Sequence, residues 1–447
     1  MNLRRLALLS TAVLLGACAS TSTPTPTAAS REAAPEAWEC PKDVPAGARC
    51  LKGLDSAGAH YVIVMPEKWS GVLVLHAHGG PTLGPVKFDR ALEDLKRWGI
   101  WVKAGHAFAA STFRQGGVEV RAAAEDTERL RGIFLQHVAK PKRTILHGQS
   151  WGAGVAAKGA EMFTAGKPYD AVLLTSGVLG GGTRSYDFRL DLRVIYQHLC
   201  NNHPRPDEPA YPLWMGLPQG ATLTPAQLRD RTKECLGLGL PAAQRTPEQA
   251  RKLKTIVDVL KIPETSVQGH LNWATQHFAD IAHQRTGGKP VFGNIGAVYK
   301  GSPDDDALNA AVLRYRADPQ AVAAFAADTD PTGRIPVPVL TMHAIHDATA
   351  FVELEHHFRQ TMQAAGSGER LVQVFSDDRE HSYLADPVYP TLAEALLQWV
   401  EQGRKPTPQG IAQRCIEMQA TYGPGCRILP AYQPAPLDTR VTPRQRP

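Results

Sequence analysis

Hydrophobic residues in the first 180 positions gather in short continuous runs, separated by stretches in which they recur every three or four positions. Continuous apolar runs are typical of strands buried on both faces of a parallel sheet, whereas the wider spacing is typical of helices with one buried face. The pattern predicts strands at residues 60–65, 71–78, 106–112, 143–148 and 171–178, and helices at 89–102, 126–138 and 151–163.

The same alternation resumes near residue 337. It predicts a strand at 337–343, a helix at 351–365, a strand at 371–375 and a last helix at 391–401. Strands that alternate with helices form a mostly parallel central sheet through right-handed crossovers, with helices on both faces. We therefore predict an α/β fold whose core is formed by residues 37–180 and 335–403.

Residues 181–334 interrupt the alternation with helical stretches that contain several aromatic side chains. This insertion begins at the carboxyl end of a strand, where open α/β sheets bind ligands. We therefore expect a large, mainly helical lid, or cap, over the functional site; the alternative is a purely structural subdomain. Residues 404–447 contain two cysteines and many prolines, and we expect them to form a stapled C-terminal extension.

Residues 1–18 have the pattern of an export signal, with two arginines followed by an apolar run at residues 6–15. That run is too short to span a bilayer comfortably. The segment Leu15-Gly16-Ala17-Cys18 resembles a bacterial lipobox, which implies that Cys18 is lipidated and anchors the chain to a membrane.

Ala19 occupies the position at which an aspartate often marks inner-membrane retention, so the resemblance implies an outer-membrane lipoprotein. A periplasmic or secreted protein is the alternative. Residues 19–36 are rich in Ser, Thr, Pro and Ala, a composition typical of a flexible tether without a core of its own.

Six cysteines remain when Cys18 is set aside, and an even number in an exported chain indicates disulfides. The sequence leaves the connectivity open. Pairing between nearest neighbours is our working hypothesis, and it joins Cys40 to Cys50, Cys200 to Cys235 and Cys415 to Cys426.

The formal net charge of +6 is modest for 447 residues, and the chain has no block of Lys and Arg interleaved with aromatic residues. The sequence therefore gives no indication of nucleic-acid binding. It indicates no protein partner either.

Residues 144–154 combine a short apolar strand, a tight turn and a helix of small residues. Within them Gly148, Gln149, Ser150, Trp151 and Gly152 fit the G-x-S-x-G nucleophile elbow. On such a turn the serine hydroxyl is exposed at the end of the strand, and glycines on either side tolerate the crowded backbone. The pattern predicts that Ser150 is a nucleophile.

A serine nucleophile needs a base and an acid that orients it. Asp347 and His381 follow the predicted strands at 337–343 and 371–375, in the order Ser, Asp, His. With this set of motifs the chain resembles an esterase-like serine hydrolase of the α/β-hydrolase fold, and the likeness covers about residues 59–180 and 335–403.

An oxyanion needs preorganised hydrogen-bond donors. The N–H of Trp151 is one candidate, because Trp151 follows the nucleophile. The second candidate comes from the turn after residues 71–78, which is similar to the His-Gly-Gly motifs of esterases and peptidases of this fold. We expect the Gly80 N–H to be this donor, with Gly79 as the alternative.

Other polar residues fit catalytic or metal chemistry less well. His76 and His78 share a strand face, but no further residues complete a metal motif, so we expect structural hydrogen bonds. Glu353 could replace Asp347 as the acid, but it lies in a predicted helix. The sequence predicts neither a metal nor a cofactor.

These residues predict hydrolysis of a small-molecule carboxylic ester through a Ser-His-Asp triad and an acyl-enzyme intermediate. A second hypothesis is a serine peptidase, because His78-Gly79-Gly80-Pro81 and Ser150-Trp151-Gly152 resemble prolyl aminopeptidases. A third hypothesis is a non-catalytic binding protein on a hydrolase scaffold, for which a broken triad is expected.

Overall fold

The computed structural model describes residues 32–447. The predicted export signal, the lipobox cysteine Cys18 and most of the predicted tether lie outside the described residues. The first strand begins at Glu36, the last residue of that predicted tether.

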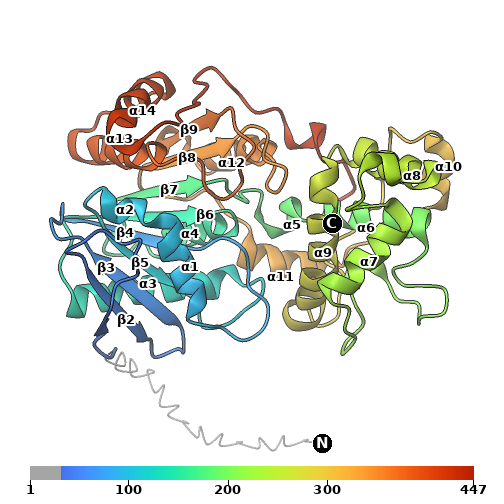
Figure 1. The fold of residues 1–447 in the computed structure, drawn as a ribbon, viewed down its shortest axis with the longest axis horizontal. Coiled ribbons are helices and arrows are strands. Elements are labelled where there is room, and N and C mark those ends of the chain that lie inside the picture. Colours follow the sequence, from blue (N-terminus) through green and yellow to red (C-terminus); the bar gives the residue numbers. More distant parts are fainter. Residues whose placement is uncertain (1–31) are drawn as a thin grey trace, which may run out of the picture. The chain divides into compact units, whose positions relative to one another are not determined.

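A single nine-stranded sheet organises the described residues, with the strand order β1-β2-β3-β5-β4-β6-β7-β8-β9 (Figure 1). The strands are β1 (Glu36–Trp38), β2 (Arg49–Leu54), β3 (His60–Met65), β4 (Val72–Ala77), β5 (Ala107–Ser111), β6 (Arg143–Gln149), β7 (Ala171–Thr175), β8 (Val339–Ala344) and β9 (Leu371–Ser376). The pairs β1–β2, β2–β3 and β3–β5 are antiparallel, and every other pair is parallel.

Helices pack on both faces of the sheet because the side chains of each strand point alternately to opposite sides. Val72 and Val74 pack with helices α1, α2 and α13, while Leu73 and Leu75 pack with α3, α4 and α12. These helices are α1 (Asp89–Trp98), α2 (Ile100–Lys103), α3 (Val120–His137), α4 (Trp151–Met162), α12 (Glu353–Ala364) and α13 (Val388–Gln402).

Residues 181–334 are mainly helical and lie at one side of the sheet (Figure 1). Their helices are α5 (Gly181–Ser185), α6 (Phe188–Cys200), α7 (Pro225–Leu236), α8 (Pro247–Leu260), α9 (Glu264–Asp280), α10 (Asp305–Ala311) and α11 (Pro319–Thr329). Short helical segments in the same region are η1 (Leu213–Met215), η2 (Ala242–Gln244) and η3 (Ile281–Arg285). Two further short segments, η4 (Gly368–Arg370) and η5 (Leu437–Thr439), lie outside it. A mostly parallel sheet with helices on both faces and a mainly helical insertion confirms the predicted fold class.

Three elements of the structure are absent from the elements predicted from the hydrophobic pattern. The antiparallel strands β1 and β2 precede the first predicted strand, and α14 (Pro408–Tyr422) lies in the C-terminal extension. The strand β1 has only three residues, two of them exposed, so it carries no apolar run. In α14 only Ile411 and Cys415 are buried, which leaves the helical pattern weak.

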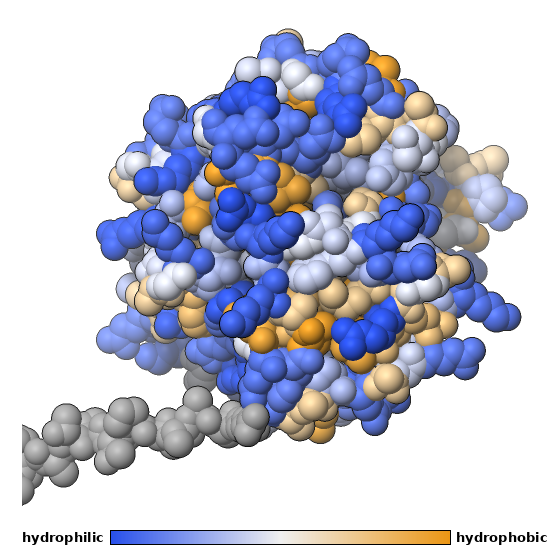
Figure 2. Space-filling model, turned by 90° about the vertical axis from the view of Figure 1, so that its left-hand side faces the viewer, coloured by the Kyte–Doolittle hydropathy of each residue, from blue (hydrophilic) through white to orange (hydrophobic). Residues whose placement is uncertain are grey.

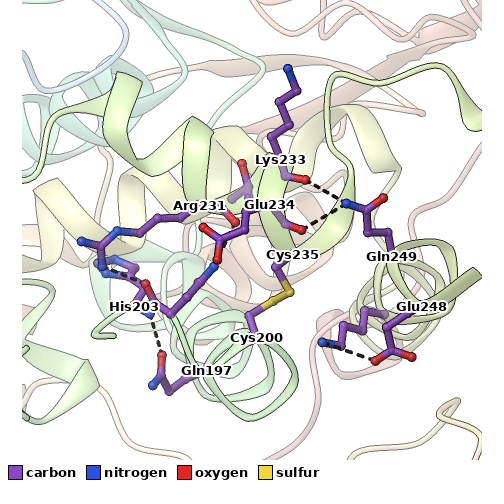
Figure 3. The surroundings of a disulfide bond; sticks show 12 residues. Gln197, Cys200, His203, Arg231, Lys233, Glu234, Cys235, Glu248 and Gln249 are labelled. Atoms are coloured by element: carbon purple, nitrogen blue, oxygen red, sulfur yellow. Dashed lines mark hydrogen bonds and ion pairs between the residues drawn. A yellow bond between two sulfur atoms is a disulfide. The ribbon is translucent and has the colours of Figure 1, made fainter. Parts of the chain in front are cut away.

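The structure pairs the six cysteines as nearest neighbours. The Cα atoms are 5.3 Å apart in Cys40–Cys50, 5.6 Å in Cys200–Cys235 and 5.8 Å in Cys415–Cys426. Figure 3 shows that the second bond links the end of α6 to the end of α7. Disulfides of this kind persist in oxidising compartments, which is typical of extracellular or periplasmic proteins.

The C-terminal segment crosses from the sheet to the cap, which we define as residues 181–334 (Figure 1). The side chain of its Arg444 is 2% exposed and forms ion pairs with Asp187 at 3.5 Å and Asp191 at 2.5 Å. The Gln445 N–H donates to Ile295 O at 2.9 Å. The end of the chain therefore fastens the cap to the core.

The face that carries α13 and α14 is a mosaic of mostly hydrophilic residues with small hydrophobic patches (Figure 2). Within residues 32–447, no helix has the length and apolar character needed to cross a membrane.

Candidate active site

Ser150 lies at the sharp turn between β6 and α4, near the middle of the sheet. Its backbone has φ 56° and ψ −121°, a conformation that costs energy in a residue with a side chain. Ser150 as a whole residue is 8% exposed. Such strain in a serine at a strand-to-helix turn is the geometry expected of a nucleophile elbow.

The glycines on either side of Ser150 are required by close backbone contacts. A Cβ atom on Gly148 would lie 2.2 Å from the carbonyl oxygen of Gly152, and a Cβ on Gly152 would lie 2.1 Å from Ala77 O. Both distances are far below contact distance, and both neighbours are backbone atoms. The two glycines therefore allow the nucleophile turn to pack against the end of β4.

The structure brings Ser150, His381 and Asp347 together. His381 Nε2 lies 2.7 Å from Ser150 Oγ, and His381 Nδ1 lies 2.6 Å from Asp347 Oδ2. With Nδ1–H donating to the carboxylate, Nε2 accepts the serine hydroxyl proton. The side chain of His381 is 19% exposed and that of Asp347 is fully buried.

Backbone and charge hold Asp347 in place. Its Oδ1 accepts hydrogen bonds from the N–H groups of Thr349 at 2.7 Å and Ala350 at 3.1 Å. Burial alone would raise the pKa of Asp347, but the charges and hydrogen bonds of His381 and His343 outweigh it. The net effect is a pKa below the ordinary value, so this carboxylate is ionised.

His343 is a second partner of Asp347 that the sequence pattern did not single out. Its Nε2 lies 3.4 Å from Asp347 Oδ2, and its Nδ1 lies 3.1 Å from Glu355 Oε1. Burial alone would lower the pKa of His343. The hydrogen bonds to Asp347 and Glu355 have the opposite and larger effect, so that the pKa is raised to about 10. His343 is therefore a buried cation beside the acid.

The two predicted oxyanion donors lie on different elements. Trp151 is the first residue of α4, whose leading N–H groups have no partner within the helix. Gly80 has φ 72°, and a Cβ atom there would meet open space. Among residues 32–447, neither N–H has a protein acceptor. The N–H of Gly79 has none either, so the choice between Gly80 and Gly79 stays a prediction.

The turn that contains these glycines is fixed by residues that the sequence analysis did not assign to it. Arg90 Nη2 donates to Gly79 O at 2.6 Å, and Gln149 Nε2 donates to His381 O at 3.3 Å. A Cβ atom on Gly79 would lie 2.1 Å from Gln149 Oε1. Gln149 therefore packs between the turn and the loop that carries His381, a contact that no local sequence motif signals.

The alternative candidates have structural partners. His76 Nδ1 lies 3.0 Å from His147 Nδ1, and His78 stacks on Phe113 with a centroid distance of 4.3 Å. Among the described residues, no group of three or more His, Cys, Asp or Glu is placed to hold a metal ion. Glu353 lies 3.5 Å from Arg440 and is engaged in the contact of α12 with the C-terminal segment.

A surface cavity of about 700 Å³ borders the predicted oxyanion turn. Gly79, Gly80 and Pro81 line it from the core, and Trp273 and His277 line it from α9 of the cap. His277 Nε2 lies 3.1 Å from Pro81 O, so the cap contacts the turn directly. The cavity therefore lies where the cap meets the predicted oxyanion turn, and neither Ser150 nor His381 lines it.

The arrangement has the parts needed for acyl transfer: a serine hydroxyl on a strained backbone turn, a histidine within proton-transfer distance of it, and an ionised carboxylate that contacts the histidine. Candidate oxyanion donors lie on the residue after the serine and on an adjacent glycine turn.

No protein-family model and no curated protein matches the chain. Solved structures with a similar fold include an esterase from Aspergillus oryzae (12% identity, 80% of this chain and 80% of that chain, TM-score 0.42). They also include feruloyl esterase B from Aspergillus oryzae (14% identity, 80% and 82%, TM-score 0.40) and tannin acyl hydrolase from Aspergillus niger (11% identity, 84% and 83%, TM-score 0.39).

Proposed function

We propose that the chain is a serine hydrolase that cleaves carboxylic esters of small molecules through an acyl-enzyme intermediate. The observation that carries this proposal is the unbroken hydrogen-bond chain from Ser150 Oγ through His381 to Asp347. The same chain argues against a non-catalytic binding protein, for which the triad has no reason to be intact.

In the proposed reaction, Ser150 Oγ attacks the ester carbonyl carbon while His381 Nε2 takes the hydroxyl proton. The N–H groups of Trp151 and Gly80, or Gly79 in its place, donate to the oxyanion. His381 then gives the proton to the leaving alcohol, and the acyl group stays on Ser150. Water, activated by the same histidine, releases the acid.

Asp347 orients His381 and stabilises its charged form during both steps. Its low pKa suits this role, because a protonated acid at this position would no longer balance the imidazolium. His343 supports Asp347 without touching the reacting atoms, so it is a positioning residue.

The test is hydrolysis of short p-nitrophenyl esters by the purified chain, with the variant S150A as the control. We expect turnover by the wild type and a rate close to that of the uncatalysed reaction for S150A. Equal rates for the two proteins would refute the proposal. Cleavage of proline arylamides in preference to esters would favour the prolyl-aminopeptidase hypothesis.

We further propose that residues 181–334 act as a lid over this site and that Cys18 is the lipidated N-terminus of an outer-membrane lipoprotein. The three disulfides support export. Metabolic labelling with a fatty acid tests the second proposal, because the variant C18A should lose the label. A cleaved, unlabelled wild-type protein would instead indicate a periplasmic or secreted form.

A further inference from the structure

Arg189, on α6 of the cap, is a buried cation without a carboxylate partner. Arg189 is 4% exposed. Its Nη1 donates to Ser185 O at 3.0 Å, whereas Nε and Nη2 have no acceptor among residues 32–447. Nε and Nη2 form one edge of the guanidinium, and this edge is the fork that binds both oxygens of a carboxylate.

The faces of this guanidinium are covered by aromatic rings. Its central carbon lies 4.7 Å from the ring centroids of Phe188 and Trp273 and 5.2 Å from that of Tyr186. Aromatic faces attract a cation, but they do not replace hydrogen-bond acceptors at its edge. The rings therefore hold the guanidinium in place and leave its fork without an acceptor among the described residues.

The contacts of these rings place Arg189 beside the candidate active site. Trp273 stacks on His277 with a centroid distance of 4.6 Å, and His277 contacts Pro81, next to the oxyanion turn. On the other side, Phe188 packs against His270 at 4.9 Å, and His270 Nε2 donates to Ala348 O at 2.8 Å. Ala348 follows the acid Asp347. Arg189 therefore lies between segments that reach both loops of the site.

The charge of Arg189 persists at neutral pH. Burial lowers its pKa to about 10, so the guanidinium is still protonated. Asp187, whose charge acts on Arg189, is engaged elsewhere, at 2.7 Å from Arg446 and 3.5 Å from Arg444. Because a buried charge is costly unless it is paired, a fork kept free beside a reaction site indicates an anionic ligand.

Arg193, one turn further along α6, is a buried arginine whose Nη1 and Nη2 both find acceptors within the cap, although its Nε, like that of Arg189, has no partner in the described residues. Its Nη1 donates to His203 O, and its Nη2 donates to Tyr211 Oη and Gly216 O, each at 3.3 Å. Arg193 thus has three oxygen acceptors, where Arg189 has one. This contrast makes Arg193 the matched control for Arg189.

We propose that Arg189 binds a carboxylate of the substrate, so that the preferred substrates are esters that carry a second, free carboxylate. This inference rests on the proposed function, and it defines the class of ester: a half-ester of a dicarboxylic acid, or an ester whose alcohol part bears a carboxylate. Arg189 then determines specificity and takes no part in bond cleavage.

Two pairs of substrates test the proposal. Monoethyl adipate and diethyl adipate differ by a carboxylate in the acyl part; 4-acetoxybenzoate and its methyl ester differ by one in the leaving part. In at least one pair, the wild type should have the higher kcat/KM for the anionic member. The variant R189Q should lose about 10- to 100-fold in kcat/KM on that member and stay within about threefold on its neutral partner.

The variants R193Q and R189K separate specificity from folding. R193Q removes a buried arginine of the same helix and should leave the ratio of anionic to neutral kcat/KM unchanged. R189K keeps the charge without the fork, so it should recover only part of the preference. An R189Q ratio equal to that of the wild type in both pairs would overturn the proposal.

A measurement on the wild type covers the case in which R189Q does not fold. Benzoate should inhibit hydrolysis of the neutral ester at lower concentration than benzamide; equal inhibition would overturn the proposal.

If the wild type hydrolyses neutral esters in a Ser150-dependent way without preferring anionic ones, only the role of Arg189 fails. If it hydrolyses neither kind, the proposed function itself fails.

Discussion

A pair of histidines and a single histidine are fully buried in the same sheet, and they differ in charge state. His76 on β4 and His147 on β6 face one another, whereas His343 on β8 lies between Asp347 and Glu355. Burial lowers the pKa of His147 to about 3, while the two carboxylates raise the pKa of His343 to about 10. Equal burial therefore leads to a neutral pair in one place and a cation in the other.

The position of the nearest carboxylate explains the difference. Asp94 Oδ1 lies 3.9 Å from His76 Nε2, and burial raises the pKa of Asp94 to about 7, so its charge is itself suppressed. Glu355 and Asp347 approach His343 to 3.1 and 3.4 Å. The charged His343 contacts the acid of the candidate triad. The neutral pair, His76 and His147, lies within the sheet and forms hydrogen bonds only.

The largest effect is expected for D347N. An asparagine presents an amide to His381 Nδ1 and favours the wrong tautomer of the imidazole. We expect kcat to fall about 10⁴-fold, the order found for the equivalent change in serine proteases. Steady-state kinetics on a p-nitrophenyl ester measure this, with circular dichroism as the folding control. A decrease of less than tenfold would mean that Asp347 is not the acid of a triad.

The next effect is expected for H343Q, which removes the buried cation and leaves two carboxylates facing each other. Removing one partner of a buried ion pair costs about 3–5 kcal/mol of unfolding free energy. Urea denaturation at neutral pH measures this loss. The variant E355Q keeps the cation and one carboxylate, so it should be destabilised less than H343Q; the opposite order would contradict the charge state assigned to His343.

The pH dependence of stability sharpens the same comparison. The pKa of His343 is raised in the folded state above its unfolded value of about 6.5. Folding therefore favours the protonated form, and its stabilisation is complete below pH 6.5 and lost as the pH rises through about 10. The difference in unfolding free energy between wild type and H343Q should shrink over this range. A difference that stays constant would show that His343 is neutral.

The smallest effect is expected for H147Q. His147 is neutral, so the substitution removes hydrogen bonds to His76 and Thr175 but no ion pair. We expect a loss of about 1–3 kcal/mol in unfolding free energy and little change in kcat. Parallel urea titrations of H147Q and H343Q decide the matter: equal losses would remove the distinction between the two groups.

The sequence predicted the parallel strands well, because a strand buried on both faces is a continuous apolar run, as in residues 71–78. It did not predict β1 and β2, which lie at the antiparallel edge: β1 has no buried residue, and β2 has only two, Cys50 and Leu51. The helix at 126–138 begins earlier in the structure, at Val120, because alanines fill its first turns without adding an apolar stripe.

That Ser150, Asp347 and His381 lie together could be predicted because each follows a strand, and parallel strands end at the same edge of the sheet. The partners behind them could not. Glu355 reaches His343 from the following helix, and Arg90 reaches Gly79 from α1. These contacts depend on tertiary packing, and each residue alone resembles an ordinary charged position on a helix.

The most direct test of the central claim is labelling of the folded protein with a fluorophosphonate, followed by peptide mapping. A fluorophosphonate reacts with a serine that an adjacent base activates. The account predicts a single adduct on Ser150, lost in the variant S150A and strongly slowed in D347N. An unlabelled wild-type protein, or an adduct on another serine, would contradict it.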